Sequence, residues 1–278
     1  MQKFYQKVKF LPLLCLTITF IVIFTCPTLS GFASPENKTL TQSQGIQGLT
    51  KNTTDIVLVH GAWADGSSWS KVIPILKEAG HQVIAVQMPL TSVADDIATV
   101  NRAINHIGGP VILVGHSYGG FVITNAAYNN PNVTGLVYIS AFAPEEDQSL
   151  SNFLDFTKFP KGLLVYDNEG FIYINPEMFR EAIADDVDPA EADIMAVVQK
   201  PINQSIFTEK SGPPAWKQIP SWFQVSGSDH ALPPDIQRLF AKQINATTVT
   251  VNASHASFIS HPVETAELIL NATKERTR

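Results

Sequence analysis

Residues 111–120 read Val-Ile-Leu-Val-Gly-His-Ser-Tyr-Gly-Gly, and this stretch decides the fold. Four apolar residues predict a short buried strand, and a helical pattern over 121–128 follows. Between them, Gly115 to Gly119 fits G-x-S-x-G, the sharp strand-to-helix turn that presents a serine as a nucleophile. Such a turn strains the backbone of Ser117, and the two glycines leave room for it. Because the motif is short, an ordinary glycine-rich connection with a surface serine is the alternative interpretation.

The same alternation of strand and helix continues on both sides of this stretch. The predicted strands are 56–60, 83–86, 111–114, 133–140, 222–226 and 247–251. The predicted helices are 67–79, 93–107, 121–128, 234–243 and 262–272. Apolar strands that alternate with helices are typical of a parallel sheet buried on both faces. We therefore predict an α/β fold with a mainly parallel six-stranded sheet and helices on both faces.

Residues 144–214 break this rhythm and are predicted to form an insertion. The segments 163–166 and 171–174 flank Asp-Asn-Glu-Gly and are expected to pair as a hairpin, with helices following at 176–184 and 189–199. Six of the 16 phenylalanines of the chain lie in this insertion. So many aromatic residues favour a lid over a pocket, although an ordinary subdomain core would also use them.

Composition and charge limit the class of protein. Of the 278 residues, 45% are hydrophobic and 16% are charged, which is ordinary for a globular α/β protein. The formal net charge is −6, and no cluster of Lys and Arg accompanies it. A mildly acidic chain of this kind argues against nucleic acid as a partner.

The N-terminus is predicted to be a targeting segment. Lys3, Lys7 and Lys9 precede an almost wholly apolar run at 10–24. Small residues then match a cleavage site, and we expect residues 1–33 to be a signal peptide. The alternative is an uncleaved membrane anchor, because the apolar run is near the lower length limit for a span. Contact with a membrane is expected only in that case.

A polar stretch without periodicity at 34–54 is predicted to be a flexible linker ahead of a domain at 55–278. Both cysteines, Cys15 and Cys26, lie in the predicted signal peptide. The mature chain would then have no disulfide, no thiolate metal site and no cysteine nucleophile. Export without disulfides is more typical of a bacterial envelope protein, so we expect a periplasmic or extracellular location.

A serine nucleophile needs a neighbouring base, and in a parallel sheet such groups collect at the carboxyl ends of strands. His255 follows the last predicted strand by four residues and is the candidate base. His230, just past the preceding strand, is its rival. Of the remaining histidines, His116 adjoins the serine but is expected to point away on the turn. The others lie in the first loop or at element boundaries: His60, His81, His106 and His261.

The base needs a carboxylate that orients it. Asp229 comes three residues after the strand at 222–226, and it completes the chain order Ser117, Asp229, His255. The alternative acids follow the strand at 133–140 and are Glu145, Glu146 and Asp147.

Two backbone N–H groups should face the negative charge that develops on a carbonyl oxygen under attack. One is expected from Tyr118, the residue after the candidate nucleophile. The other is expected from the loop after the first strand, from Ala62.

These motifs together resemble the α/β-hydrolase superfamily, and in particular the plant methylesterase and hydroxynitrile lyase group with its bacterial esterase relatives. The resemblance covers roughly 55–272, and the insertion matches only loosely. The stretches that carry it are 57–63, 115–120, Asp229 with 231–234, and 254–255. It implies an α/β-hydrolase fold, a Ser-His-Asp triad of Ser117, His255 and Asp229, and no metal or organic cofactor.

Two positions separate esterases from lyases within this group. The cyanohydrin lyases carry a threonine in place of Gly61 and a lysine directly after the catalytic histidine, where this chain has Ala256. Without that lysine no cation is at hand for a leaving cyanide. The resemblance therefore implies a serine esterase that acts on a small to medium carboxylic ester. A lyase of the hydroxynitrile type and a non-catalytic ligand-binding protein are the alternatives.

Overall fold

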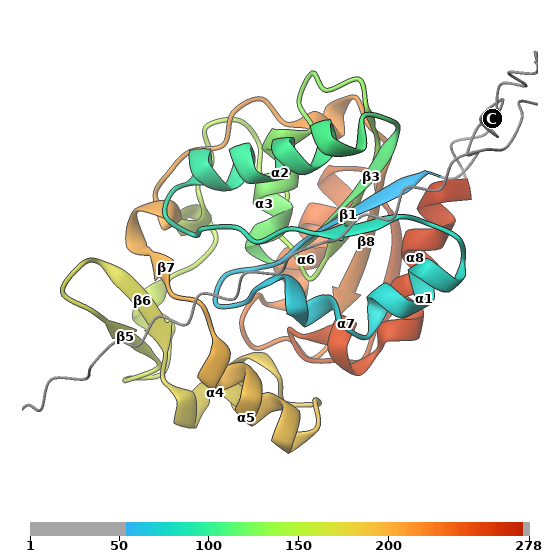
Figure 1. Ribbon diagram of the computed structural model, residues 1–278. Coiled ribbons are helices and arrows are strands. Elements are labelled where there is room, and N and C mark those ends of the chain that lie inside the picture. Colours follow the sequence, from blue (N-terminus) through green and yellow to red (C-terminus); the bar gives the residue numbers. More distant parts are fainter. Residues whose placement is uncertain (1–53, 275–278) are drawn as a thin grey trace, which may run out of the picture. The chain divides into compact units, whose positions relative to one another are not determined.

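The computed structural model describes residues 54–274 (Figure 1). The predicted signal peptide and all but the last residue of the predicted linker lie outside the described residues, so both stay predictions. Within 54–274, no helix is both long and apolar enough to cross a membrane.

A six-stranded parallel sheet forms the centre of the fold, as predicted. Its strands lie in the order β2-β1-β3-β4-β8-β9, and every neighbouring pair is parallel. The strands are β1 (Asp55–Val59), β2 (Val83–Ala85), β3 (Val111–His116), β4 (Val133–Ile139), β8 (Ser221–Ser226) and β9 (Thr247–Val251). Because β1 and β3 lie side by side in parallel, the loop after β1 and the turn after β3 meet at one edge of the sheet.

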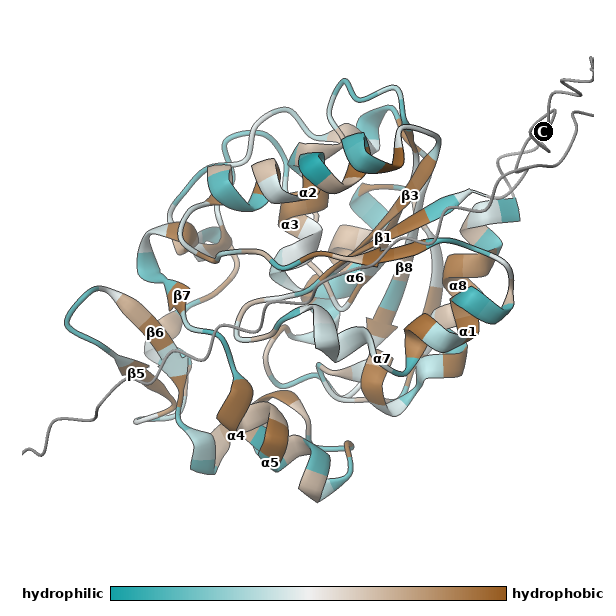
Figure 2. Cartoon of the chain, viewed as in Figure 1, coloured by the Kyte–Doolittle hydropathy of each residue, from teal (hydrophilic) through white to brown (hydrophobic). Residues whose placement is uncertain are grey.

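Helices cover both faces of the sheet, and two apolar clusters fill the space beneath them. Alternate residues of one strand reach opposite clusters. Val57 and Val59 pack under the first helical layer, and Ile56 and Leu58 pack under the second. The first layer is α2 (Val93–Ile107), α3 (Tyr118–Ala126) and α6 (Pro234–Gln243), and the second is α1 (Val72–Glu78) with α8 (Pro262–Lys274). In Figure 2 the central strands are therefore brown, while outward parts of the helices are teal.

Some element bounds differ from the sequence predictions for identifiable local reasons. The predicted helix at 67–79 divides into a 3₁₀ turn, η1 (Gly66–Trp69), and α1, and the cap of the turn is Asp65 rather than a serine. The helix after β3 begins at Tyr118, directly on the turn, because the sharp turn itself starts the helix. A short helix, α7 (Ser257–Ser260), follows His255 and was not predicted, since four residues carry no helical period.

The insertion between β4 and β8, residues 144–214, forms its own small layer, which we call the inserted segment. Its hairpin, β5 (Leu164–Tyr166) and β6 (Phe171–Ile174), is antiparallel as predicted, and β7 (Ile202–Asn203) adds a third strand too short to predict. Helices α4 (Pro176–Ile183) and α5 (Pro189–Val198) lie between β6 and β7 in the chain. The inserted segment also holds three 3₁₀ turns, η2 (Leu150–Asn152), η3 (Phe156–Lys158) and η4 (Gln204–Phe207), and η5 (Ala215–Lys217) follows it. Figure 1 shows α4, α5 and the three strands grouped on one side of the central sheet.

Candidate active site

The turn between β3 and α3 holds Ser117 in a strained backbone conformation, with φ 52° and ψ −122°. A Cβ atom on Gly115 would lie 2.5 Å from the carbonyl oxygen of Gly119, and one on Gly119 would lie 2.5 Å from that of Val59. Real Cβ atoms do not approach so closely, so both positions require glycine. The strain persists because the turn is fixed from outside: the N–H of Ser117 donates to the carbonyl oxygen of Ile139, and the carbonyl oxygen of Ser117 accepts from the N–H of Phe142. The turn therefore has the geometry of a nucleophile elbow.

Asp229 and His255 form a buried hydrogen-bonded pair. His255 Nδ1 lies 2.6 Å from Asp229 Oδ2. The two side chains are 6% and 0% exposed, so water does not compete for this bond. An ionised carboxylate only accepts, so Nδ1 carries the proton and the other ring nitrogen, Nε2, is left as an acceptor. This tautomer can take a proton from a hydroxyl group.

A network of donors surrounds the Asp229 carboxylate. Its Oδ1 accepts from the N–H groups of Ala231 and Leu232, both at 2.8 Å. Its Oδ2 accepts from Gln237 Nε2 at 2.7 Å as well as from His255. Several hydrogen bonds to both oxygens of a carboxylate hold its orientation. The carboxylate of Asp229 is thus fixed facing His255.

Gln237 is one of the residues at this site that sequence reasoning missed. It is fully buried on α6, donates to Asp229 and to the carbonyl oxygen of Leu232, and accepts from the N–H of Ser226. A signal was present in the sequence. Gln237 shares the helix face of Phe240 and Ala241, which lie three and four residues later and are buried. A polar side chain on the apolar face of an amphipathic helix needs a buried partner.

Substitution of Gln237 by Leu is expected to lower kcat for ester hydrolysis about tenfold to a hundredfold with little change in KM, because one charge-assisted hydrogen bond to Asp229 is lost. Steady-state kinetics on a p-nitrophenyl ester measures both constants. The matched control is Gln243→Leu, on the same helix, since the Gln243 amide binds the carbonyl oxygen of Ala143 instead. Equal losses of kcat in the two variants would show that any loosening of α6 lowers activity and that the bond to Asp229 has no special effect.

His116, which was expected to point away on the turn, supports the loop of His255. Its ring packs 4.7 Å from the ring of His255, and its Nε2 donates to the backbone carbonyl oxygen of His255 at 3.0 Å. Burial is the main reason that the pKa of His116 is held well below its usual value, and nearby His255 lowers it further. A neutral His116 supports the His255 loop without placing a second positive charge beside it. Sequence order could not reveal this contact, which joins residues 139 positions apart.

Tyr118 is held by a buried acid that sequence reasoning also missed. Its hydroxyl group donates to Asp96 Oδ2 at 2.8 Å, and Asp96 Oδ1 accepts from the N–H of Leu90. Burial raises the pKa of Asp96 to about 6, although both hydrogen bonds oppose the shift. Burial likewise raises the pKa of Tyr118 well above its usual value, with the Asp96 charge as the next cause, so the phenol stays protonated as the donor.

Asp96 is expected to make folding stability depend on pH. Its pKa in the folded state, about 6, lies above the usual 3.8, so the folded protein binds more protons than the unfolded chain between these values. Its contribution to the unfolding free energy is therefore greatest near pH 4 and declines as pH rises to 6, by at most about 3 kcal/mol. Denaturant unfolding measures the free energy of unfolding of wild type and Asp96→Asn at pH 4.5 and 7. The excess of wild type over the variant should be smaller at pH 7.

The comparison with the variant cancels other titrating groups. His60 is one of these, because burial lowers its pKa to about 4 and gives it the opposite pH dependence. Asp193→Asn, an exposed acid on α5, serves as the control. If the excess unfolding free energy of wild type over Asp96→Asn grew with pH, it would contradict the raised pKa of Asp96.

The competing candidates from the sequence are occupied elsewhere or exposed. Among the acids, Glu145 pairs with Lys217 at 2.6 Å and Asp147 with Lys210 at 4.0 Å. His60 is fully buried in the core, where its Nε2 accepts from the N–H of Met88. His230 is exposed at the rim of the cavity described next. The structure therefore pairs His255 with Asp229 and with no other predicted acid.

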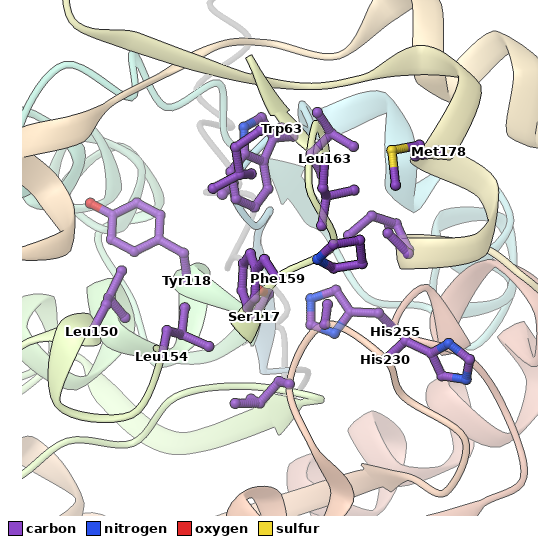
Figure 3. A pocket seen from close by; sticks show the side chains of 18 of the residues that line it. Trp63, Ser117, Tyr118, Leu150, Leu154, Phe159, Leu163, Met178, His230 and His255 are labelled. Carbon is purple, nitrogen blue, oxygen red and sulfur yellow. The ribbon is translucent and has the colours of Figure 1, made fainter. Parts of the chain in front are cut away.

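A mainly apolar cavity of about 190 Å³, which we call the main cavity, is lined by Ser117 and His255. Figure 3 shows Ser117 and His255 on its wall, with Phe159 and Leu163 of the inserted segment among the side chains around them. Ala62 and Tyr118, the predicted oxyanion-hole residues, also line it. Tyr118 is the first residue of α3, so its N–H has no acceptor within the helix. The structure thus brings four of the five predicted site residues to one cavity, with Asp229 directly behind His255.

Within residues 54–274, no group of three or more His, Cys, Asp or Glu side chains is placed to hold a metal ion.

The fold and this cavity define the class of protein. A family model described as the alpha/beta hydrolase family matches residues 56–268. The chain belongs to this family, and the fold predicted from the resemblance is confirmed.

Individual relatives share most of the chain at low identity. A pyrethroid hydrolase of Sphingobium wenxiniae is 27% identical over 78% of this chain and 86% of its own length. Polyneuridine aldehyde esterase of Rauvolfia serpentina is 23% identical over 80% of this chain and 96% of its own. A crystal structure of a pyrethroid hydrolase from Sphingobium faniae superposes with a TM-score of 0.67 at 25% identity, covering 78% of this chain and 96% of that one. Methylesterases and an alpha-hydroxynitrile lyase of Arabidopsis thaliana match as well, which confirms the predicted group.

Proposed function

We propose that this protein is a serine esterase that cleaves a small to medium, mainly apolar carboxylic ester. The observation that carries the proposal is the buried 2.6 Å hydrogen bond between His255 and Asp229, next to a strained serine turn on one apolar cavity. Relatives named as a pyrethroid hydrolase, a carbendazim hydrolyzing esterase and methylesterases support ester hydrolysis.

In the proposed reaction Ser117 Oγ attacks the ester carbonyl carbon while His255 Nε2 takes its proton. Asp229 stabilises the imidazolium that forms, and the N–H groups of Ala62 and Tyr118 bind the oxyanion. His255 then gives the proton to the departing alcohol oxygen, which leaves an acyl group on Ser117. Water, activated by His255, releases the acid and restores the serine. The mainly apolar lining favours substrates with an apolar acyl group.

Hydrolysis of a series of p-nitrophenyl esters by the purified protein tests the proposal. We expect turnover that is highest for apolar acyl groups fitting the main cavity. Absence of turnover across p-nitrophenyl esters, methyl esters and lactones would reject the esterase assignment.

The lyase alternative has a relative in its favour, an alpha-hydroxynitrile lyase of Arabidopsis thaliana that is 32% identical over 38% of this chain. Two local features argue against lyase activity. Ala256, directly after His255, is buried and offers no cation. At Gly61 a Cβ atom would lie 2.9 Å from both the Ser117 Cβ and His116 Nδ1, so a threonine there would displace the turn. Release of cyanide from mandelonitrile, measured beside the ester assays, separates the two activities.

A further inference from the structure

A second, smaller cavity of about 70 Å³ adjoins the candidate active site. Four residues line both cavities: Ala62, Trp63, Ile183 and His255. Ser117 and Tyr118 line only the main cavity. The remaining walls of the small cavity come from the loop around η1, from α4 and α5 of the inserted segment, from His116 at the end of β3, and from Ala256 and Phe258 at the start of α7. The two cavities are therefore separated by a thin partition next to the reacting groups.

Trp63 is the largest side chain of this partition and is held firmly. Its backbone has φ 55°, a left-handed conformation that a bulky residue rarely adopts. Its indole N–H donates to the carbonyl oxygen of Ile172 on β6 at 2.9 Å, and its ring lies 6.0 Å from that of Phe207. Strained residues that the surrounding structure fixes in this way are concentrated at functional sites. Figure 3 shows the ring of Trp63 among the side chains that line the main cavity.

The opposite side of the partition is tied to the His255 loop. The carbonyl oxygen of Ile183, at the end of α4, accepts from the N–H of Ala256 at 2.9 Å and from Ser254 Oγ at 3.2 Å. These donors are the two chain neighbours of His255. The inserted segment is thus anchored to both catalytic loops, through Ile172 to the loop of Trp63 and through Ile183 to the loop of His255.

We propose that Trp63 divides the substrate site into two subsites, and that the small cavity is the subsite for the alcohol end of the ester. The inference rests on the proposed function. In the acylation step the bond from Ser117 Oγ to the carbonyl carbon forms and the bond to the alcohol oxygen breaks. The proton that Ser117 loses passes through His255 to that oxygen. The alcohol must therefore leave beside His255, which lines both cavities, whereas the acyl group stays on Ser117 in the main cavity.

The size of the small cavity limits what enters it. At about 70 Å³ the small cavity has less than half the volume of the main cavity, which is about 190 Å³. Apolar side chains such as Phe179, Met195 and Phe258 form much of its lining. With Trp63 in place, the subsite suits a short alkyl alcohol, and a longer one meets the indole ring.

Alkyl esters of one acid, from ethyl to hexyl, test this assignment through the release of acid in a pH-stat. In Trp63→Gly the ring is removed, and glycine adopts φ 55° without strain. We expect the ratio of kcat/KM for hexyl over ethyl ester to rise about tenfold or more, the size of effect that one accommodated methylene gives in a pocket. Trp63→Phe keeps an aromatic wall but loses the indole N–H, and it should keep a ratio close to that of wild type. Preference for acyl length, measured with p-nitrophenyl esters, should change less than this ratio in Trp63→Gly, because Trp63 is one of many side chains that line the main cavity.

Phe207→Ala is the matched control, because Phe207 contacts Trp63 but lines only the main cavity. Its hexyl-to-ethyl ratio should stay near that of wild type. An unchanged ratio in Trp63→Gly, a shift in acyl preference instead, or an equal rise in Phe207→Ala would overturn the assignment. A wild-type protein that hydrolyses none of these esters would reject the proposed function itself, which is a distinct result. Thermal unfolding of each variant confirms that the comparison is made on folded protein.

Discussion

Ser117→Ala is expected to lower kcat for p-nitrophenyl ester hydrolysis about a million-fold, the loss typical when the nucleophile of a serine triad is removed. The hydroxyl oxygen is the only non-hydrogen atom lost. Alanine meets the same strain at φ 52° as serine, so the turn and the melting temperature should be retained. A fluorophosphonate probe, which modifies an activated serine, should label wild type and leave the variant unlabelled.

Ser140→Ala provides a matched control for the labelling experiment. Ser140 is also a buried serine directly after a strand, with φ 46°, and its hydroxyl group contacts Ser226 and Ser257 away from the cavity. This variant should still be labelled. Wild type that resists the probe while it binds esters would instead favour the non-catalytic ligand-binding alternative.

Asp229→Asn is expected to lower kcat about ten-thousandfold, through the orientation of His255 rather than through lost binding. The asparagine oxygen would replace Oδ1, which accepts from Ala231 and Leu232, so its NH₂ group would face His255. His255 Nδ1 must then act as the acceptor, and the ring proton moves to Nε2, the nitrogen that has to receive the serine proton. KM should change little, because Asp229 does not line the cavity.

Glu145→Gln and Asp147→Asn serve as controls for this variant, since both acids were candidates from the sequence. Both pair with surface lysines, and their removal should leave kcat within a few-fold of wild type. A large loss of kcat in either control, with activity retained in Asp229→Asn, would show that the catalytic acid lies after β4 instead.

The alternation of strands and helices was readable in the sequence because β1, β3, β4 and β8 are buried along almost their whole length and are therefore mainly apolar. The bounds of α2, α6 and β9 agree with the predictions, and those of the other long elements differ by a few residues. The elbow was also readable, because a Cβ atom at 115 would meet the backbone of the turn itself and one at 119 would meet the backbone after β1, so both positions need glycine. His255 and Asp229 could be chosen by chain order, since parallel strands deliver their carboxyl ends to one edge.

The supports of the site were decided only by tertiary structure. His116 binds the carbonyl oxygen of His255, Gln237 binds Asp229, and Asp96 binds Tyr118, and each of these contacts joins separate elements of the chain. A hydrogen bond depends on the direction of a side chain at the end of an element. Hydrophobic periodicity specifies the buried face of an element but not that direction.

The two cavities, likewise, could not be predicted from patterns in the sequence. The sequence alone determined an α/β fold with a serine turn and an insertion rich in phenylalanine, because these features depend on local pattern and backbone sterics. Only the tertiary structure decided that Trp63 stands between a large and a small cavity, anchored to a strand 109 residues away in the chain. The physical reason is that a cavity is the space that several packed elements leave between them, and no single segment specifies that space.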